Sequence, residues 1–289
     1  MFRGSYVAIV TPMKDGRVDF DKMGELIERQ IAAGTDGIVP AGTTGESATL
    51  SHDEHHSVVE FTIKTVAGRV KVVAGAGSNA THEAVSLTKA AEAAGADGVL
   101  SISPYYNKPT PEGMYRHFRK VAEATRLPVV IYNVPSRTGR EIDLATCARL
   151  AQIENIVAIK EAGGSVDRAS WLTRIEGLDV ISGDDSLTLP MIAVGAIGVI
   201  SVVANVVPAD MRAMVHAALD GDFARARELH HKMLPLAGEL FRENNPMGAK
   251  TALKLMGLLN GEVREPLCGL MPENEKKLDK VLRDYGLVS

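Results

Sequence analysis

Short runs of apolar residues recur along most of the chain, and each run is continuous rather than alternating with polar positions. Strands that are buried on both faces, as in a parallel sheet covered by helices, have this pattern. We therefore predict eight strands, at residues 6–10, 37–39, 70–74, 98–102, 128–132, 156–159, 178–181 and 198–201.

Segments with apolar residues at helical spacing lie between these runs. Residues 19–33 carry Phe20, Met23 and Ile27 at this spacing, and Gly34 follows as a stop signal. We predict further helices that begin at residues 51, 81 and 111, and two more over 143–150 and 166–175. Beyond residue 221 only helical patterns remain, over 223–241, 246–259 and 273–285, and Asn245 before Pro246 is a typical cap-and-start signal.

Eight strands that alternate with helices predict an α/β fold, a (β/α)8 TIM barrel over residues 1–221. Residues 222–289 are expected to form a C-terminal helical region that packs on the barrel, because no low-complexity linker precedes them. An open doubly wound sheet is the alternative. That fold usually has a glycine fingerprint after its first strand, whereas Thr11, Pro12 and Met13 follow the first run here.

Composition narrows the class of protein. The charges of the 289 residues sum to −4 at neutral pH, so no basic surface of the kind that binds nucleic acids or anionic membranes is indicated. Two cysteines, Cys147 and Cys268, are too few for a disulfide framework and predict free thiols in a reducing compartment. Because the N-terminus lacks the pattern of a secretion signal and no apolar stretch is long enough to span a membrane, we expect a cytoplasmic protein.

Reactive residue types follow several predicted strands, at the end where (β/α)8 barrels place their active sites. Lys160 ends the sixth strand, where burial would disfavour the charged amine and lower its pKa. A neutral amine attacks carbonyl groups to form a Schiff base, and Tyr132, at the matching height of the neighbouring strand, is suited to move protons during that reaction. The alternatives are a lysine that extends to solvent and a tyrosine that only completes the rim.

Three more residues at this rim carry groups that bind carboxylates or relay protons. Thr43 and Thr44 lie in a glycine-flanked turn, which lacks the lysine of a phosphate-binding loop. Arg137 is a natural bidentate partner for a carboxylate. Alternatively, Thr43 and Thr44 form only a plain turn before a helix, and Arg137 is a solvated surface residue.

The histidines at positions 52, 55 and 56 have helical spacing that suits a metal ion. They lack the His-Glu-Xaa-Xaa-His order and a nearby cysteine, so a solvated helix face or a polar ligand site is favoured over metal.

Together these motifs resemble the pyruvate-dependent class I aldolases, the N-acetylneuraminate lyase family, over nearly the whole chain. Within it, the turn with two threonines and the arginine of the loop are similar to the dihydrodipicolinate synthase branch rather than to the sialate lyases. The motifs are Gly42-Thr43-Thr44-Gly45-Glu46, Tyr132-Asn133-Val134-Pro135, Pro135-Ser136-Arg137-Thr138-Gly139 and Ala158-Ile159-Lys160-Glu161.

The resemblance implies a lyase that condenses pyruvate with L-aspartate 4-semialdehyde to 4-hydroxy-tetrahydrodipicolinate, a step of diaminopimelate and lysine biosynthesis, through a covalent pyruvate imine on Lys160 and without a metal or organic cofactor. Another pyruvate-dependent aldolase, such as an N-acetylneuraminate lyase or a 2-keto-3-deoxygluconate aldolase, is the alternative. The alternative that is not an enzyme is a non-catalytic barrel that binds a small acid. Such a protein would be expected to have lost Lys160 or Tyr132, and both are present.

The same resemblance assigns roles to further residues. Tyr132, Thr43 or Thr44, and Tyr106 from an adjacent subunit correspond to a proton relay, which needs at least a dimer. The resemblance implies a homotetramer, a dimer of dimers. Arg137 corresponds to the residue that binds the aldehyde substrate's carboxylate. The positions matched to pyruvate binding are Thr44, Gly183 and Val202, the last through its backbone.

A second site, for the effector L-lysine, also follows from the resemblance and implies feedback inhibition at a subunit interface. Its matched positions offer a carboxylate for an ammonium group together with hydroxyl, imidazole and amide partners. They are Ser47, Ala48, His52, His55, Asn79, Glu83 and Tyr105.

Overall fold

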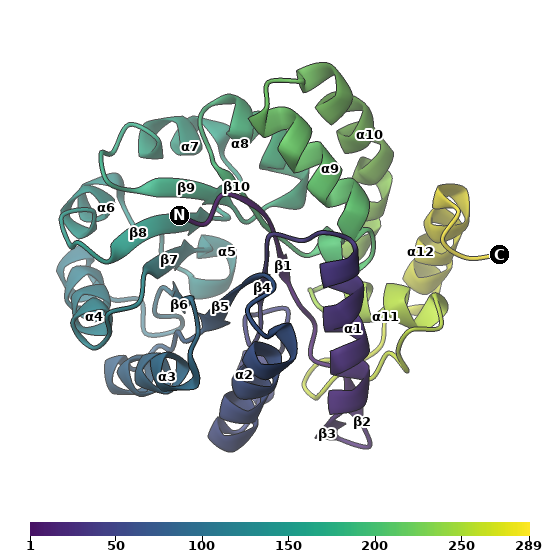
Figure 1. The fold of residues 1–289 in the computed structure, drawn as a ribbon, viewed down its shortest axis with the longest axis horizontal. Helices are drawn as coiled ribbons and strands as arrows, with labels where there is room; N and C mark the ends of the chain where they lie inside the picture. The colour runs from purple at the N-terminus through teal and green to yellow at the C-terminus, as the bar shows by residue number, and fades with distance from the viewer.

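The computed structural model describes residues 1–289 and has at its centre a closed barrel of parallel strands ringed by helices (Figure 1). All eight predicted strands form, with ends shifted by at most two residues, so the (β/α)8 barrel is confirmed. They are β1 (Gly4–Ala8), β4 (Gly37–Val39), β5 (Lys71–Gly75), β6 (Gly98–Ile102), β7 (Val129–Asn133), β8 (Ile156–Glu161), β9 (Asp179–Ser182) and β10 (Gly198–Ser201).

The barrel closes because β1 pairs in parallel with both β4 and β10, while every other strand pairs with its neighbours in chain order. The pairings differ in length. Five residue pairs join β7 to β8, but a single pair, Val199 with Ser182, joins β10 to β9. The β9–β10 seam is therefore held by few ladder hydrogen bonds.

An outer ring of helices covers the strands, as Figure 1 shows. The helices are α1 (Phe20–Ala32), α2 (His52–Val66), α3 (Thr81–Ala94), α4 (Pro111–Glu123), α6 (Leu144–Leu150), α7 (Val166–Leu172), α8 (Thr188–Ala193) and α9 (Pro208–Leu219). Short elements at the strand exits are α5 (Pro135–Thr138) and the 3₁₀ turns η1 (Ser47–Thr49), η2 (Asp185–Leu187) and η3 (Val203–Asn205).

Apolar side chains form two separate clusters. The smaller one fills the barrel interior and contains alternate strand residues such as Val130, Tyr132, Ala158 and Ile200. The larger one lies between the strands and the helices. This alternation fixes which side chains of each strand point inward, as expected for a barrel.

One element was not predicted. A hairpin of β2 (Met13–Lys14) and β3 (Arg17–Val18) lies between β1 and α1, with its turn at Asp15 and Gly16 in the left-handed backbone region. Its strands are too short to leave a periodic signal in the sequence.

The last residues form α10 (Phe223–Leu240), α11 (Met247–Leu255) and α12 (Pro272–Tyr285), which lie together on one side of the molecule in Figure 1. α10 packs against α9 and α12. The Tyr285 hydroxyl donates to Asp210 on α9, and the Lys232 amine lies 2.7 Å from the same carboxylate. The division into 1–221 and 222–289 itself stays a prediction.

The prediction that Asn245 caps the helix after it is wrong. Pro246 occupies the cap position of α11 without a capping side chain, and the Asn245 side chain instead reaches a turn of the barrel. Cys147 is buried and Cys268 exposed, both as free thiols. No helix combines the length and hydropathy that crossing a bilayer requires.

Candidate active site

Tyr132 and Lys160 are register partners on the neighbouring strands β7 and β8. Both point into the barrel, because they share the inward alternation of Val130 and Ala158. The Lys160 amine nitrogen lies 4.3 Å from the centroid of the Tyr132 ring. The two side chains that the sequence singled out are thus brought together at the carboxyl ends of the strands.

Burial governs the charge of Lys160. Its side chain is 5% exposed, so the alternative of a lysine that extends to solvent is wrong. The pKa of the amine is lowered to about 8, chiefly by loss of hydration; the carboxylates of Asp185 and Asp184 oppose this shift, and the Arg137 guanidinium adds to it. A substantial fraction of the amine is therefore neutral and nucleophilic near neutral pH.

Tyr132 is buried as well, and loss of hydration raises the pKa of its phenol to about 12. The Arg137 guanidinium and the hydroxyl of Thr43 act in the opposite direction. The phenol is therefore protonated at neutral pH, where it can donate a proton to an atom of a bound substrate and recover it afterwards.

The turn after β4 carries the two threonines. Thr44 is buried, and its hydroxyl accepts a hydrogen bond of 2.9 Å from the Asn245 side-chain amide. The Thr11 hydroxyl donates to the Gly45 carbonyl at 2.7 Å. Thr11, which follows β1, thus holds the turn from one side, and Asn245 of the C-terminal region holds it from the other.

Glu46 ends this turn in the left-handed backbone region, with φ of 57°. Its buried carboxylate forms an ion pair with the buried Lys250 of α11 and accepts from the Arg264 backbone N–H at 2.9 Å. The Lys250 amine also donates to the Glu262 carbonyl at 2.7 Å. The glutamate of the turn motif is therefore a structural anchor for residues that follow the barrel.

Arg137 lies on α5, exposed at the rim, and its guanidinium donates to the Asn245 carbonyl at 3.2 Å. Asn245 thus contacts both Arg137 and Thr44, and sequence reasoning missed it. Its only signal in the sequence, a polar residue before a proline, predicts a helix cap instead.

Gly183 contacts the lysine closely. A Cβ at this position would lie 2.9 Å from the Lys160 Cε, so only glycine fits beside the extended lysine chain. Val202 lies differently. Its N–H donates to Asp185 at 3.0 Å and its carbonyl accepts from Asn205 at 3.0 Å, so both backbone groups have internal partners. On the same strand exit, Ile200 rather than Val202 shares the barrel interior with Tyr132.

Tyr106 is not part of this cluster within one chain. It is 89% exposed, in the loop after β6, and its backbone is in the left-handed region with φ of 71°. Nothing in its own chain covers the ring.

The residues matched to the effector site lie near the rim on α2, α3 and adjoining loops. The His52 ring lies 2.7 Å from the Glu83 carboxylate, which also accepts from the Ser78 hydroxyl. His55 is buried, and burial lowers the pKa of its ring to about 4. Ser47 and Ala48 lie on η1, Asn79 lies before α3 and its carbonyl accepts from Asn107 at 2.9 Å, and Tyr105 is half-buried.

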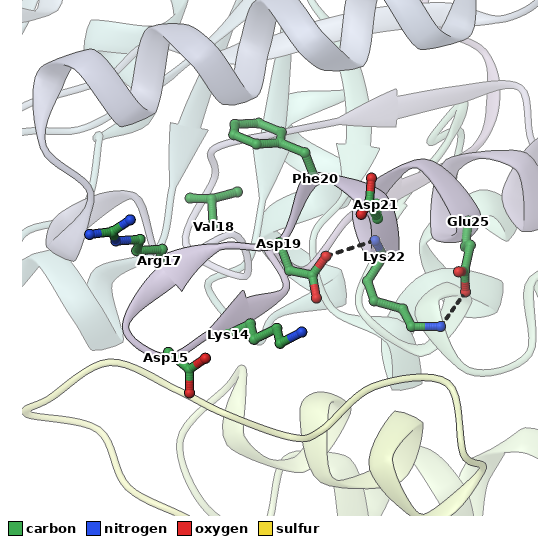
Figure 2. Close-up of a pocket in the computed structure, with 9 residues that line it drawn as sticks. All are labelled: Lys14, Asp15, Arg17, Val18, Asp19, Phe20, Asp21, Lys22 and Glu25. Carbon is green, nitrogen blue, oxygen red and sulfur yellow. Dashed lines mark hydrogen bonds and ion pairs between the residues drawn. The ribbon is translucent and has the colours of Figure 1, made fainter.

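Two further observations delimit the site. No group of three or more His, Cys, Asp or Glu side chains is arranged to hold a metal ion. A hollow of about 740 Å³ lies at the β2–β3 hairpin and the start of α1. Figure 2 shows its lining, which includes charged side chains such as Arg17, Asp21 and Lys22. None of the candidate active-site or effector-site residues lines it, and it opens on the surface.

Comparisons with known proteins agree with the geometry. A curated protein of Syntrophus aciditrophicus, named 4-hydroxy-tetrahydrodipicolinate synthase, is 53% identical over the full length of both chains. The crystal structure of the dihydrodipicolinate synthase from Aquifex aeolicus is 52% identical, with 99% of each chain covered and a TM-score of 0.98.

Two further solved structures hold ligands. The chloride-inhibited enzyme from Acinetobacter baumannii, complexed with pyruvate, is 44% identical over the full length of both chains with a TM-score of 0.98. The enzyme from Cyanidioschyzon merolae, with lysine bound, is 38% identical with 99% of each chain covered and a TM-score of 0.96. A family model matches residues 1–285, and the chain belongs to the dihydrodipicolinate synthetase family.

Proposed function

We propose that this protein condenses pyruvate with L-aspartate 4-semialdehyde to give 4-hydroxy-tetrahydrodipicolinate. The observation that carries the proposal is the buried Lys160 amine, with a pKa of about 8, held 4.3 Å from the centroid of the Tyr132 ring. The names of full-length relatives at 53% identity support the same reaction.

The chemistry begins when the neutral Lys160 amine attacks the keto carbon of pyruvate. A C–N bond forms, the oxygen leaves as water, and an iminium results. This cation is an electron sink, so a methyl proton is lost and an enamine forms. The enamine carbon then attacks the aldehyde of the second substrate, and that substrate's own amine closes the ring and displaces Lys160. No external cofactor is required by these steps.

Proton transfers accompany the formation of the imine and the attack on the aldehyde. We assign them to the Tyr132 phenol, which lies beside Lys160 and is protonated at neutral pH, and to the hydroxyl of Thr43, which hydrogen-bonds to Tyr132, or of its neighbour Thr44. We assign Thr44 and Gly183 to pyruvate and Arg137 to the carboxylate of the aldehyde substrate. The backbone of Val202 completes the assignment to pyruvate, although its N–H also donates to Asp185 and its carbonyl also accepts from Asn205.

A coupled assay with both substrates and the next reductase tests the reaction. Turnover is expected in the wild type and absent in Lys160→Ala, while Lys89→Ala, a change of an exposed lysine on α3, retains it. Reduction with borohydride in the presence of pyruvate, followed by peptide mass spectrometry, should place the adduct on Lys160. Cleavage of N-acetylneuraminate in place of the condensation would overturn the proposal in favour of a lyase of the same chemistry.

We infer that a second copy of the chain completes the proton relay by supplying Tyr106. Its exposed ring sits on a loop whose strained backbone, at φ of 71°, has no packing partner in its own chain. A homotetramer built as a dimer of dimers would supply that partner. Sedimentation of wild type and Tyr106→Ala tests this: a wild type that is a fully active monomer would refute it.

We also propose that L-lysine inhibits the enzyme at the effector site matched above, which contains His52 and Glu83. The Glu83 carboxylate, whose pKa is lowered chiefly by the Ser78 hydroxyl, is an anion suited to the ammonium group of lysine. A solved relative with lysine bound supports the proposal. Titration with lysine should inhibit the wild type and leave Glu83→Gln unaffected, and full wild-type activity at millimolar lysine would refute it.

A further inference from the structure

Asp185 is a buried carboxylate that no step of the proposed reaction uses. It begins η2 directly above β9 and is 5% exposed. One oxygen accepts from the Ser201 hydroxyl, and the other accepts from the N–H groups of Val202 at 3.0 Å and Val203 at 3.3 Å. Three donors converge on one charge, which is how buried carboxylates are stabilised.

These hydrogen bonds cross the weakest pairing of the barrel. β9 and β10 share only the pair of Ser182 with Val199, and Asp185 follows β9 while its three donors lie at the end of β10 and just beyond. The Ser201 hydroxyl also accepts from the Ala204 N–H at 2.8 Å. Asp185 therefore joins the carboxyl ends of two strands that the sheet itself joins poorly.

The same strand end contacts the nucleophile. Gly183, two positions before Asp185, leaves only 2.9 Å between a hypothetical Cβ and the Lys160 Cε. The absence of a side chain at residue 183 therefore leaves the space that the Lys160 chain occupies, and the position of the β9 end sets the wall beside that chain. The Asp185 carboxylate is also the first of the charges that favour the ammonium form of Lys160.

Other charged groups around Asp185 do not duplicate this arrangement. Asp184 also favours the ammonium form of Lys160, but its side chain accepts from the Gly164 N–H at 3.1 Å and does not join β9 to β10. His230 of α10 lines the same small cavity of about 10 Å³ behind Asp185, and burial lowers the pKa of its ring. Burial raises the pKa of Asp185 to about 6, so its carboxylate is charged where Lys160 titrates, near pH 8.

We propose that Asp185 is a positioning residue for the Schiff-base lysine: by joining β9 to β10 it fixes Gly183 against Lys160, and its fixed negative charge stabilises the cationic iminium of the proposed function. It touches neither substrate. It acts in two ways: its hydrogen bonds to residues 201–203 hold the strand ends together, and its negative charge favours a positive charge on the Lys160 nitrogen.

The charge of Lys160 can be measured without turnover. Competitive acetylation with acetic anhydride across a pH series, read by peptide mass spectrometry, gives the midpoint at which the amine becomes reactive. In Asp185→Asn, which keeps the size but removes the charge, we expect that midpoint to fall by about half to one pH unit. Ser201→Ala keeps the charge of Asp185 but removes a donor that partly neutralises it, so a smaller shift in the opposite direction, towards higher pH, is expected.

Asp284→Asn, a change of an exposed carboxylate on α12, is the matched control and should leave the midpoint unchanged. Unshifted midpoints in both Asp185→Asn and Ser201→Ala would overturn the inference. If Asp185→Asn does not fold, Ser201→Ala decides the question alone.

Borohydride trapping with pyruvate on the same samples separates this inference from the proposed function. Trapping in the wild type together with unshifted acetylation midpoints refutes the role of Asp185 and leaves the function intact. Shifted midpoints without trapping in the wild type uphold the link between Asp185 and Lys160 and refute the function.

Discussion

The side-chain amide of Asn245 donates a hydrogen bond of 2.9 Å to the Thr44 hydroxyl, although 201 positions separate the two residues in the chain. The Asn245 carbonyl also accepts from Arg137 at 3.2 Å. One residue beyond the barrel strands thereby orients a group assigned to each of the two substrates.

Replacing Asn245 with alanine removes the amide that donates to Thr44 but keeps the backbone carbonyl that accepts from Arg137. We therefore expect kcat/KM for pyruvate, the substrate assigned to Thr44, to fall about fivefold, because one hydrogen bond is worth about 1 kcal/mol, and kcat/KM for the aldehyde substrate to fall less. Steady-state kinetics check this, with the exposed neighbour Asn244→Ala as the matched control. Equal kinetics in the two variants would show that Thr44 needs no support from the C-terminal region.

Loss of the Tyr132 hydroxyl should separate imine formation from turnover. In Tyr132→Phe the ring still packs beside Lys160, but the proton donor is gone, so we expect turnover to fall by about 10² to 10⁴ while borohydride still traps some pyruvate. Tyr115→Phe, on the outer helix α4, is the control. Unchanged turnover in Tyr132→Phe would remove the phenol from the relay.

Burial of the Lys160 amine should cost stability in a defined pH range. Its pKa falls from 10.5 to about 8 on folding, so the unfolded chain binds the proton more tightly and the penalty is complete below pH 8. At about 1.4 kcal/mol per pKa unit, Lys160→Met should raise the free energy of unfolding at pH 7 by on the order of 3 kcal/mol.

The advantage of Lys160→Met should shrink as the pH rises from 8 towards 10.5, where the unfolded amine also loses its proton. Urea unfolding at several pH values measures it. An advantage that grows over this range would contradict the sign of the shift.

The buried pair of Glu46 and Lys250 should respond strongly when one partner is removed. Lys250→Ala leaves the Glu46 carboxylate without its partner in a site where both side chains are 1% exposed, so a loss of about 3–5 kcal/mol is expected. Lys280→Ala, which removes a solvent-exposed partner of Asp284, should cost less than about 1 kcal/mol. Denaturant unfolding measures the free energy of unfolding of both variants. Similar losses of stability in the two would argue against a structural role for the buried pair.

The barrel could be predicted because its strands are covered on both faces, which forces continuous runs of apolar residues such as those around Val130 and Ile159. Lys160 and Tyr132 could be placed together for the same reason, since residues that end neighbouring parallel strands meet at one rim. These inferences need only the local pattern and the topology.

Contacts between distant segments left no such pattern. Asn245 before a proline has the appearance of a helix cap, and nothing nearby in the sequence marks its contact with Thr44. Asp185 follows a glycine and another aspartate in an ordinary turn, and its role depends on donors at residues 201–203. Side-chain partners across long sequence separations are decided by packing, which a single sequence does not display.

The contacts of the turn after β4 also determine when, during synthesis of the chain, the candidate active site can be completed. Thr44 and Glu46 leave the ribosome early, but their partners Asn245, Lys250 and Arg264 are synthesised some two hundred residues later. A nascent chain can pair its barrel strands before those partners exist, yet it lacks the amide that holds Thr44. The site is therefore completed by the final helices, and a product of premature termination would also lack the cation that pairs with Glu46.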